Sequence, residues 1–263
     1  MDLGLNGKVA MVAAASKGLG YAVARELAME GANVSISSSN SASIQAAKNN
    51  IEKESRQNVV ACVADVRSPD AIKQWYDETI KLCGGVDLLF VNAGGPSAGG
   101  FLSFDDTAWQ DAVDLLLFSA VRMARVVLPS MKQRGGGAVV FSASSSVKEP
   151  IENLVLSNVV RATIPALSKT LSRECAADHI RFNTVLPGRI DSERVRALDA
   201  INAQKKNISI EEQRKVMQAA IPLGRYGKID EYARAVLFLL SPASSYITGA
   251  TLWVDGGMIR SVM

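Results

Sequence analysis

Two glycines, Gly18 and Gly20, open a helix-like stretch that directly follows the apolar run VAMVAAA (9–15). Because glycine has no Cβ atom, the backbone at such a turn can approach a phosphate group closely, and the amides at the helix start face it. The positive end of the helix dipole also lies at this point. We therefore expect a pyrophosphate to bind here, and the alternative is a tight strand-to-helix turn that binds no ligand.

Apolar runs and longer amphipathic stretches alternate along the chain, a pattern typical of strands and helices that follow each other in turn. This alternation implies right-handed βαβ units and a mostly parallel sheet with helices on both faces. We expect one doubly wound α/β domain over residues 1–263. The predicted strands are 9–15, 33–37, 58–65, 86–95, 137–145, 180–187 and 249–257, and the predicted helices are 18–31, 41–55, 70–84, 105–134, 152–178 and 230–241.

The composition excludes several classes of protein. Of the 263 residues, 48% are hydrophobic and 21% are charged, and the net charge of +3 is spread without a basic run, so we expect no nucleic-acid partner. No apolar run reaches the length of a membrane span, about 18 residues, and the first residues lack the pattern of a signal peptide. The three cysteines, Cys62, Cys83 and Cys175, are far apart and odd in number, and His179 is the single histidine. We therefore expect a cytoplasmic protein without a metal or a membrane partner.

The chain resembles the short-chain dehydrogenase/reductase family at five landmarks that follow the family's order. The landmarks are AASKGLG at the family's TGxxxGxG loop, Asp65 where the family holds the adenine, Asn92-Ala93-Gly94 at its NAG motif, Pro187-Gly188 at its PG motif, and ITGATLWVDGG (247–257) at its C-terminal signature. The resemblance implies a Rossmann-type domain with a seven-stranded sheet. It also implies a carbonyl compound or an alcohol as substrate. Within the family, the chain most resembles 3-oxoacyl-(acyl-carrier-protein) reductases. Ala13-Ala14 replaces Thr-Gly, so we expect a slightly altered loop that still binds the cofactor.

The resemblance implies a nicotinamide cofactor. An acidic residue after the second strand selects NAD, whereas a nearby cation accommodates the 2′-phosphate of NADP. The second strand here ends in Ser37-Ser38-Ser39-Asn40 without a carboxylate, and Lys17 lies in the loop. NADP is therefore favoured, and NAD is the alternative cofactor. The alternative for Lys17 is an ordinary solvated surface lysine that binds no phosphate. The expected cofactor-binding residues are Ala14, Ser16, Lys17, Gly18, Leu19, Gly20, Ser38, Ser39, Asp65, Val66, Asn92, Ala93, Gly94, Pro187, Gly188, Ile190 and Ser192.

The resemblance also places the catalytic groups, and here the chain departs from the family. The family uses a serine, the tyrosine and lysine of a YxxxK motif, and an asparagine in the preceding long helix. Ser144 matches the serine, with Ser145 beside it, although either could be an ordinary turn serine. Ser157 replaces the tyrosine, Arg161 replaces the lysine, and Leu116 replaces the asparagine. The candidate catalytic residues are therefore Ser144, Ser157 and Arg161.

These replacements change the chemistry that the site can perform. An aliphatic hydroxyl is a far weaker acid than a phenol, and arginine stays protonated, so neither Ser157 nor Arg161 exchanges a proton readily. A fixed cation and hydroxyl groups still stabilise an oxyanion. General acid catalysis contributes about 10²–10⁴-fold, so its loss would leave a slow reductase that takes its proton from water. The alternatives are proton donation by Lys148 or Glu149, a nucleotide-binding sensor or scaffold without turnover, and a lyase or isomerase.

Three further features bear on the shape of the site. Pro165 is expected to bend the helix at Arg161, because proline has no amide to donate to that carbonyl. We expect residues 189–224 to form an irregular insertion with a capping box at Ser209 and Glu212. The resemblance makes this insertion a substrate lid, and its composition suits either an acyl chain with an anionic group or a solvated surface. The helix at 105–134 is apolar on more than one face, and the family pairs its long helices, so we expect a homotetramer or homodimer.

Overall fold

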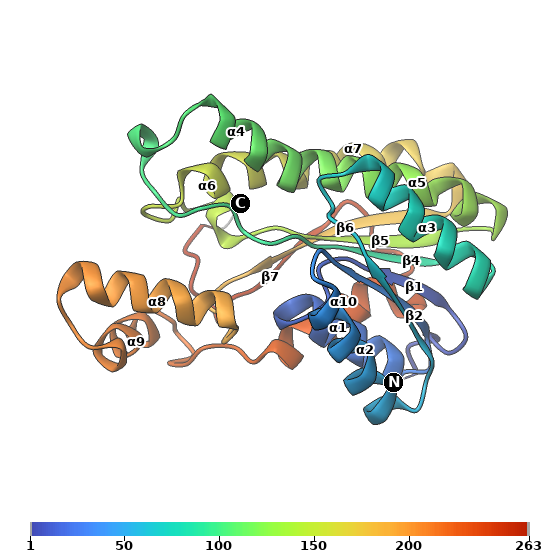
Figure 1. The fold of residues 1–263 in the computed structure, drawn as a ribbon, viewed down its shortest axis with the longest axis horizontal. Helices are drawn as coiled ribbons and strands as arrows, with labels where there is room; N and C mark the ends of the chain where they lie inside the picture. The colour runs from blue at the N-terminus through green and yellow to red at the C-terminus, as the bar shows by residue number, and fades with distance from the viewer. Residues whose placement is uncertain (1, 262–263) are drawn as a thin grey trace.

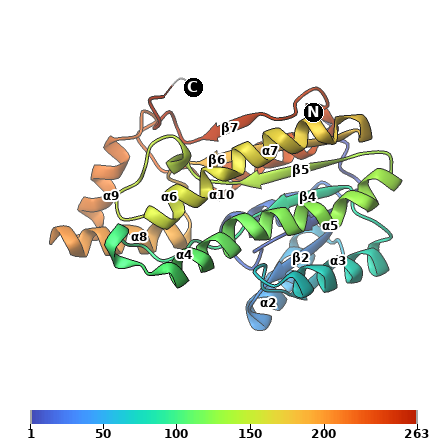
Figure 2. The same cartoon turned by 90° about the horizontal axis from the view of Figure 1, so that it is seen from above.

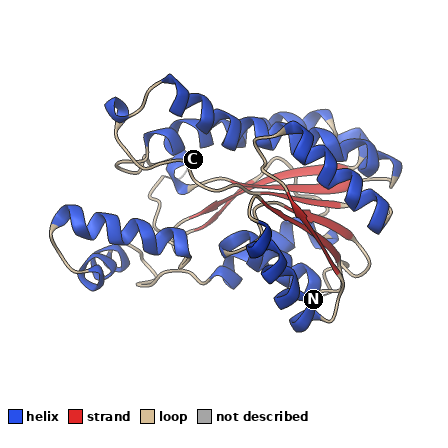
Figure 3. Ribbon diagram, viewed as in Figure 1, coloured by secondary structure: helices blue, strands red, loops and turns tan. Residues whose placement is uncertain are grey.

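The computed structural model describes residues 2–261, and within them seven strands form one sheet (Figures 1 and 3). Every neighbouring pair of strands is parallel, and the order is β3-β2-β1-β4-β5-β6-β7. The expected doubly wound Rossmann-type sheet is confirmed, and residues 1 and 262–263 of the expected domain lie outside the described residues. The strands are β1 (Val9–Val12), β2 (Asn33–Ser38), β3 (Val59–Val63), β4 (Leu88–Val91), β5 (Gly137–Ser142), β6 (Ile180–Pro187) and β7 (Thr251–Val254).

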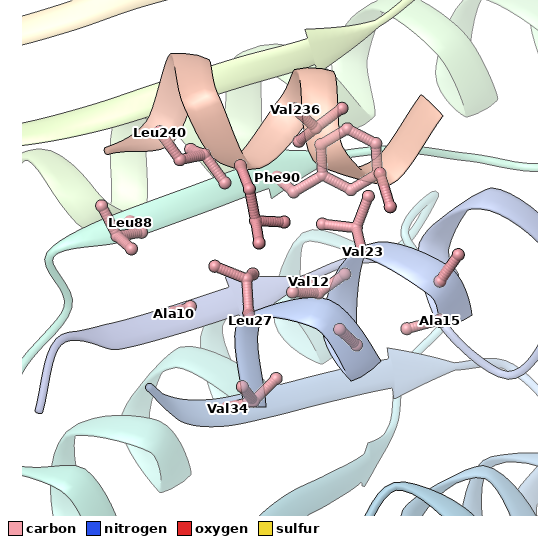
Figure 4. Packing of buried hydrophobic residues seen from close by; sticks show 14 of the residues in the cluster. Ala10, Val12, Ala15, Val23, Leu27, Val34, Leu88, Phe90, Val236 and Leu240 are labelled. Atoms are coloured by element: carbon pink, nitrogen blue, oxygen red, sulfur yellow. The ribbon is translucent and has the colours of Figure 1, made fainter. Parts of the chain in front are cut away.

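Helices cover both faces of the sheet, as the alternating sequence pattern requires (Figure 2). One face carries α1 (Gly18–Met29), α2 (Ser41–Ser55) and α10 (Ile229–Leu240), and the other carries α3 (Pro69–Cys83), α5 (Ser119–Gln133) and α7 (Thr163–Glu174). Figure 4 shows the first layer, in which Val23 and Leu27 of α1 pack with Val236 of α10 over the strand residues Val12 and Phe90. The strands are therefore apolar on both sides, as in other doubly covered sheets.

Helix α3 illustrates how local sequence fixes an element. The Ser68 side chain accepts a hydrogen bond from the Ala71 amide at 3.2 Å, and Pro69 occupies the first helical position. Asp70 in the first turn and Lys81 in the last turn complement the helix dipole. Gly84 ends the helix in the left-handed region with φ 76°, where glycine is the favoured residue.

The two long predicted helices are both interrupted. The first consists of α4 (Asp106–Val113), a π-helical turn (Asp114–Phe118) and α5. The second divides into α6 (Val155–Arg161) and α7, with a break at Ala162 and a short 3₁₀ turn at Ala176–Asp178. The bend that we expected from Pro165 is confirmed, because α6 ends at the residue whose carbonyl would otherwise accept the missing amide.

The segment 189–224 is helical, so the prediction of an irregular insertion is wrong. It contains α8 (Glu193–Lys206) and α9 (Ile210–Ala219), which lie beyond the carboxyl ends of the strands (Figure 1). The apolar residues of α8 do not gather on one side, so the sequence carries no amphipathic signal there. The predicted capping box is confirmed, because the Ser209 side chain accepts from the Glu212 amide and the Glu212 carboxylate accepts from the Ser209 amide.

Four short 3₁₀ turns complete the described chain. They are Phe101–Ser103, Ser145–Val147, Ala176–Asp178 and Pro242–Ser244. None of the helices within residues 2–261 combines the length and the apolarity that crossing a membrane would require.

Candidate active site

A cavity of about 830 Å³ opens at the carboxyl ends of the strands, where doubly wound sheets bind their ligands. It spans the point between β1 and β4 at which the strand order reverses. The expected catalytic residues all line it, and so do the expected cofactor residues other than Gly20. Those lining residues are Ala14, Ser16, Lys17, Gly18, Leu19, Ser38, Ser39, Asp65, Val66, Asn92, Ala93, Gly94, Ser144, Ser157, Arg161, Pro187, Gly188, Ile190 and Ser192.

The glycine-rich loop fits a dinucleotide. Helix α1 starts after Lys17 without a side-chain cap, so its first amides are free to face a phosphate. Gly18 adopts φ 61° and lines the cavity. Gly20 instead lies beneath the loop, because a Cβ atom there would come within 2.4 Å of the Ala14 carbonyl oxygen. Gly20 therefore supports the loop through close helix packing and does not line the cavity.

Ala14 retains the backbone of the glycine that it replaces in the family pattern. Its φ of 49° lies in the left-handed region, which costs a non-glycine residue about 1–2 kcal/mol. The expected alteration of the loop therefore takes the form of an alanine in a strained, left-handed backbone conformation.

The far end of the cavity is lined by hydroxyl groups and by two ion pairs. The Ser38 hydroxyl donates to the Ser16 hydroxyl at 3.1 Å, so β2 and the loop are joined directly. Lys17 pairs with Glu193 at the start of α8, and both side chains are exposed. The hydrogen bonds from the Arg67 guanidinium lower the pKa of the Asp65 carboxyl below its usual value.

The catalytic candidates come from two elements on one side of the cavity. Ser144 follows β5, and its Oγ accepts a hydrogen bond from the Ser146 amide at 3.1 Å, which orients the hydroxyl. Ser157 lies on α6 and is 8% exposed. Both side chains line the cavity, so both hydroxyls can donate to a ligand oxygen.

Arg161 is fixed at the carboxyl ends of two adjacent strands. Its Nη2 donates to the Gly94 carbonyl at 3.1 Å, and its Nη1 donates to the carbonyls of Ser142 and Ala143, each at 3.4 Å. The pKa of Arg161 is lowered to about 10, chiefly by burial, which Tyr232 partly offsets and the nearby charge of Arg194 reinforces. The guanidinium therefore remains a cation at neutral pH in a half-buried position.

The position of the family's asparagine is occupied by an apolar residue. Leu116 is buried in a cluster with Ala112, Leu156 and Val160, where the family pattern has its asparagine. In the part of the chain that the structure describes, no tyrosine lines the cavity. Tyr232 donates to the Ser142 Oγ at 2.8 Å from within the core, and burial raises the pKa of its phenol.

The proposed alternative donors also lie away from the cavity. Lys148 and Glu149 are exposed and are absent from its lining. The Glu149 carboxylate accepts a hydrogen bond from the Arg260 amide at 2.9 Å. The sequence suggested them only because they follow Ser144 closely, and the 3₁₀ turn after Ser144 directs the chain away.

The sequence analysis missed the contribution of α8. Arg194 lines the cavity and donates to the Pro96 carbonyl at 2.9 Å, and Leu198 and Ile201 line it further along the helix. Ser192 caps α8, with its Oγ 3.4 Å from the Val195 amide. The sequence signal for the start of α8 was Ser192, a common N-cap residue, followed directly by Glu193 in the first turn.

The chain matches known proteins over nearly its whole length. A family model described as enoyl-(acyl carrier protein) reductase matches residues 13–259. Dehydrogenase/reductase SDR family member 4 of Oryctolagus cuniculus is 35% identical over 254 residues, which cover 96% of this chain and 94% of that protein. The 3-oxoacyl-(acyl-carrier-protein) reductase FabG of Vibrio harveyi is 33% identical over 259 residues, 97% of this chain and 99% of that protein.

A solved structure supports the same assignment. L-Sorbose reductase from Gluconobacter frateurii, complexed with NADPH and L-sorbose, has a TM-score of 0.95 and 30% sequence identity and covers 100% of both chains. The resemblance inferred from the sequence motifs is therefore confirmed. The chain belongs to the short-chain dehydrogenase/reductase family of oxidoreductase enzymes.

Proposed function

We propose that this enzyme uses NADPH to reduce a small carbonyl compound to an alcohol without a tyrosine acid. The observation that carries the proposal is the position of Arg161, whose guanidinium is held by the carbonyls of Gly94, Ser142 and Ala143 beside two cavity hydroxyls. A fixed cation at this point stabilises negative charge that develops on a substrate oxygen.

The cofactor supplies a hydride to the carbonyl carbon when it is bound. Ser144 and Ser157 donate hydrogen bonds to the carbonyl oxygen, and the charge of Arg161 stabilises the alkoxide that forms there. Water then supplies the proton, because a serine hydroxyl is too weak an acid and an arginine holds its proton. The expected consequence is a reductase about 10²–10⁴-fold slower than one with a positioned general acid.

The residues near the end of β2 support a preference for NADPH. Ser38 and Ser39 carry no negative charge to repel a 2′-phosphate, and Lys17 offers a cation. The exposed ion pair of Lys17 with Glu193 competes only weakly with phosphate binding by Lys17, because such pairs contribute about 0–1 kcal/mol. A phosphate with up to two charges therefore competes well with one carboxylate for Lys17.

The segment 189–224 serves as the lid of the site within one domain. Helix α8 contributes cavity residues, and two of its side chains reach the main body, Glu193 to Lys17 and Arg194 to the Pro96 carbonyl. The exposed side chains of Phe118 and Val159, at 42% and 53%, support pairing of α5 and α6 with a second copy. We propose a homodimer or homotetramer, which light scattering on the purified protein would detect.

A nucleotide-binding sensor or scaffold is the second candidate. The burial of Leu116 with Leu156 and Val160 favours it, because this apolar packing removes the family's proton relay while leaving the cofactor site intact. The two candidates share NADPH binding and differ in turnover.

The cofactor preference is tested by fluorescence titration of NADPH and NADH. We expect wild-type protein to bind NADPH more tightly, Lys17→Met to weaken NADPH by about 10-fold with little change for NADH, and Glu193→Gln to strengthen NADPH slightly. Equal binding of the two cofactors by the wild type would contradict the NADPH preference. Oxidation of NADPH with a panel of ketones and 3-oxoacyl thioesters then separates the reductase from the sensor.

A further inference from the structure

Two guanidinium groups converge on one short backbone segment beside the catalytic candidates. Arg161 donates to the Gly94 carbonyl at 3.1 Å, and Arg194 donates to the Pro96 carbonyl at 2.9 Å. The Arg194 guanidinium also lies over Gly95, where a Cβ atom would come within 2.9 Å of its Nη2. Residues 94–96 therefore hold two cations close together at the wall of the cavity.

Neither of these arginines has a carboxylate partner among residues 2–261. Three other cavity cations are paired, Lys17 with Glu193, Arg67 with Asp65 and Arg189 with Asp199, whereas Lys205 lines the cavity and takes part in no ion pair within residues 2–261. Glu152 also lines the cavity, but it is exposed and takes part in no ion pair within the described chain. The wall formed by Arg161 and Arg194 thus carries uncompensated positive charge.

This arrangement is unfavourable for the protein alone, because like charges at short range repel, more strongly where water is partly excluded. The repulsion is relieved when an anion binds between the two guanidiniums, and a carboxylate suits their planar donor geometry. Next to this wall the lining is apolar, with Leu115, Leu154, Leu198, Ile201 and Met258.

We infer that the substrate of the proposed reductase carries a carboxylate, which Arg194 binds beside the Arg161 cation that faces the carbonyl oxygen, while the apolar wall holds a short aliphatic chain. The class is that of aliphatic oxo acids, and Arg194 is its specificity-determining residue. That the bound anion is a substrate rests on the proposed function. Binding of the anion itself can be measured without turnover.

The first test compares butyrate with butyramide, which have nearly the same shape and differ in charge. Their affinities for the NADPH complex are measured by line broadening of the ligand methyl signal in ¹H NMR titrations. We expect wild-type protein to bind butyrate about 10- to 100-fold more tightly than butyramide, the range for hydrogen bonds to charged groups. Equal affinities in the wild type would overturn the inference without any variant.

Variants of α8 then assign the effect. Arg194→Met should abolish the preference for butyrate, and Arg194→Lys should keep part of it. Arg196→Met is the matched control, because Arg196 lies on the same helix, pairs with Asp191 and does not line the cavity. A preference for butyrate that persists in Arg194→Met would overturn the inference. So would a loss of NADPH affinity in that variant, because Arg194 would then bind a cofactor phosphate.

A kinetic test separates this inference from the proposed function. Acetoacetate and acetoacetamide are offered as a matched pair of carbonyl substrates, and kcat/KM should favour acetoacetate in the wild type but not in Arg194→Met. If neither compound is reduced while butyrate binding depends on Arg194, the anion site stands and the reductase proposal fails. If both are reduced at equal efficiency, the reductase proposal stands and the anion site fails.

Discussion

The attachment of the proposed lid, α8 and α9, depends on one buried carboxylate, and removal of that carboxylate has a calculable effect. Asp199 on α8 is completely buried and accepts hydrogen bonds from the Arg189 Nη1 at 2.7 Å and the Tyr226 hydroxyl at 2.8 Å. The Arg189 side chain is only 17% exposed. The substitution Asp199→Ala would leave a nearly buried guanidinium and a buried hydroxyl without their acceptor.

Breaking a buried ion pair from one side costs about 3–5 kcal/mol, because the remaining charge stays out of water. At 1.36 kcal/mol for each factor of ten, this corresponds to a factor of about 10²–10⁴ in the equilibrium constant for opening of this segment. The cost falls on α8 and α9, because Asp199 joins α8 to Arg189 at the start of the segment 189–224 and to Tyr226 just after its end, and neither partner lies in a sheet strand. We therefore expect local opening to respond more than global unfolding.

Hydrogen exchange followed by mass spectrometry measures this directly. Amides within residues 193–219 should exchange at least about 100-fold faster in Asp199→Ala, while amides of β4 and β5 change little. Asp77→Ala is the control, because Asp77 pairs with Lys73 at an exposed site and should change exchange very little. Lid exchange within about threefold of the wild type in Asp199→Ala would show that the buried pair does not hold the lid.

Three further predictions concern the loop, the acid limb of stability and the site. Ala14→Gly should raise the free energy of unfolding by about 0.5–1 kcal/mol. The relief of left-handed strain, about 1–2 kcal/mol, exceeds the free-energy cost of the greater backbone entropy of glycine in the unfolded chain. Thermal unfolding checks this, and a lower Tm would contradict it. Arg225 lowers the pKa of the Glu231 carboxyl from 4.5 to about 2, so this carboxylate stabilises the fold above pH 4.5 and loses that effect as the pH falls toward 2. In urea unfolding, the free energy of unfolding of Glu231→Gln should therefore decline less between pH 5 and pH 3 than that of the wild type. The kcat of the wild type should show no phenol titration between about pH 6 and 9, whereas Ser157→Tyr/Arg161→Lys should introduce one, and a matching inflection in the wild type would argue for another proton donor.

The sequence was sufficient for the sheet because short apolar runs alternate with longer amphipathic stretches along the chain. It also placed the glycine-rich loop between β1 and α1, where Gly18 lines the cavity. The break at Ala162 followed from Pro165 alone. These features are local, so the residues that determine them are neighbours in the chain.

The parts that the sequence did not reveal depend on contacts between distant segments. Helix α8 is held by the ion pair of Arg189 with Asp199, and its apolar residues form no periodic stripe. The place of Arg194 beside Pro96 depends on a contact across 98 residues of chain. Gly20 was expected in the cavity, and only the fold shows that it packs against Ala14.

The role of Arg161 can be measured with the variant Arg161→Met, using NADPH titration and steady-state NADPH oxidation with a carbonyl substrate. Loss of a preorganised charge that stabilises an oxyanion reduces kcat by about 10²–10³-fold, and we expect that loss while NADPH binding changes by less than about 10-fold. Wild-type protein that binds NADPH tightly but reduces no carbonyl, while Ser157→Tyr/Arg161→Lys does so, would contradict this and identify a binding protein that has lost its chemistry.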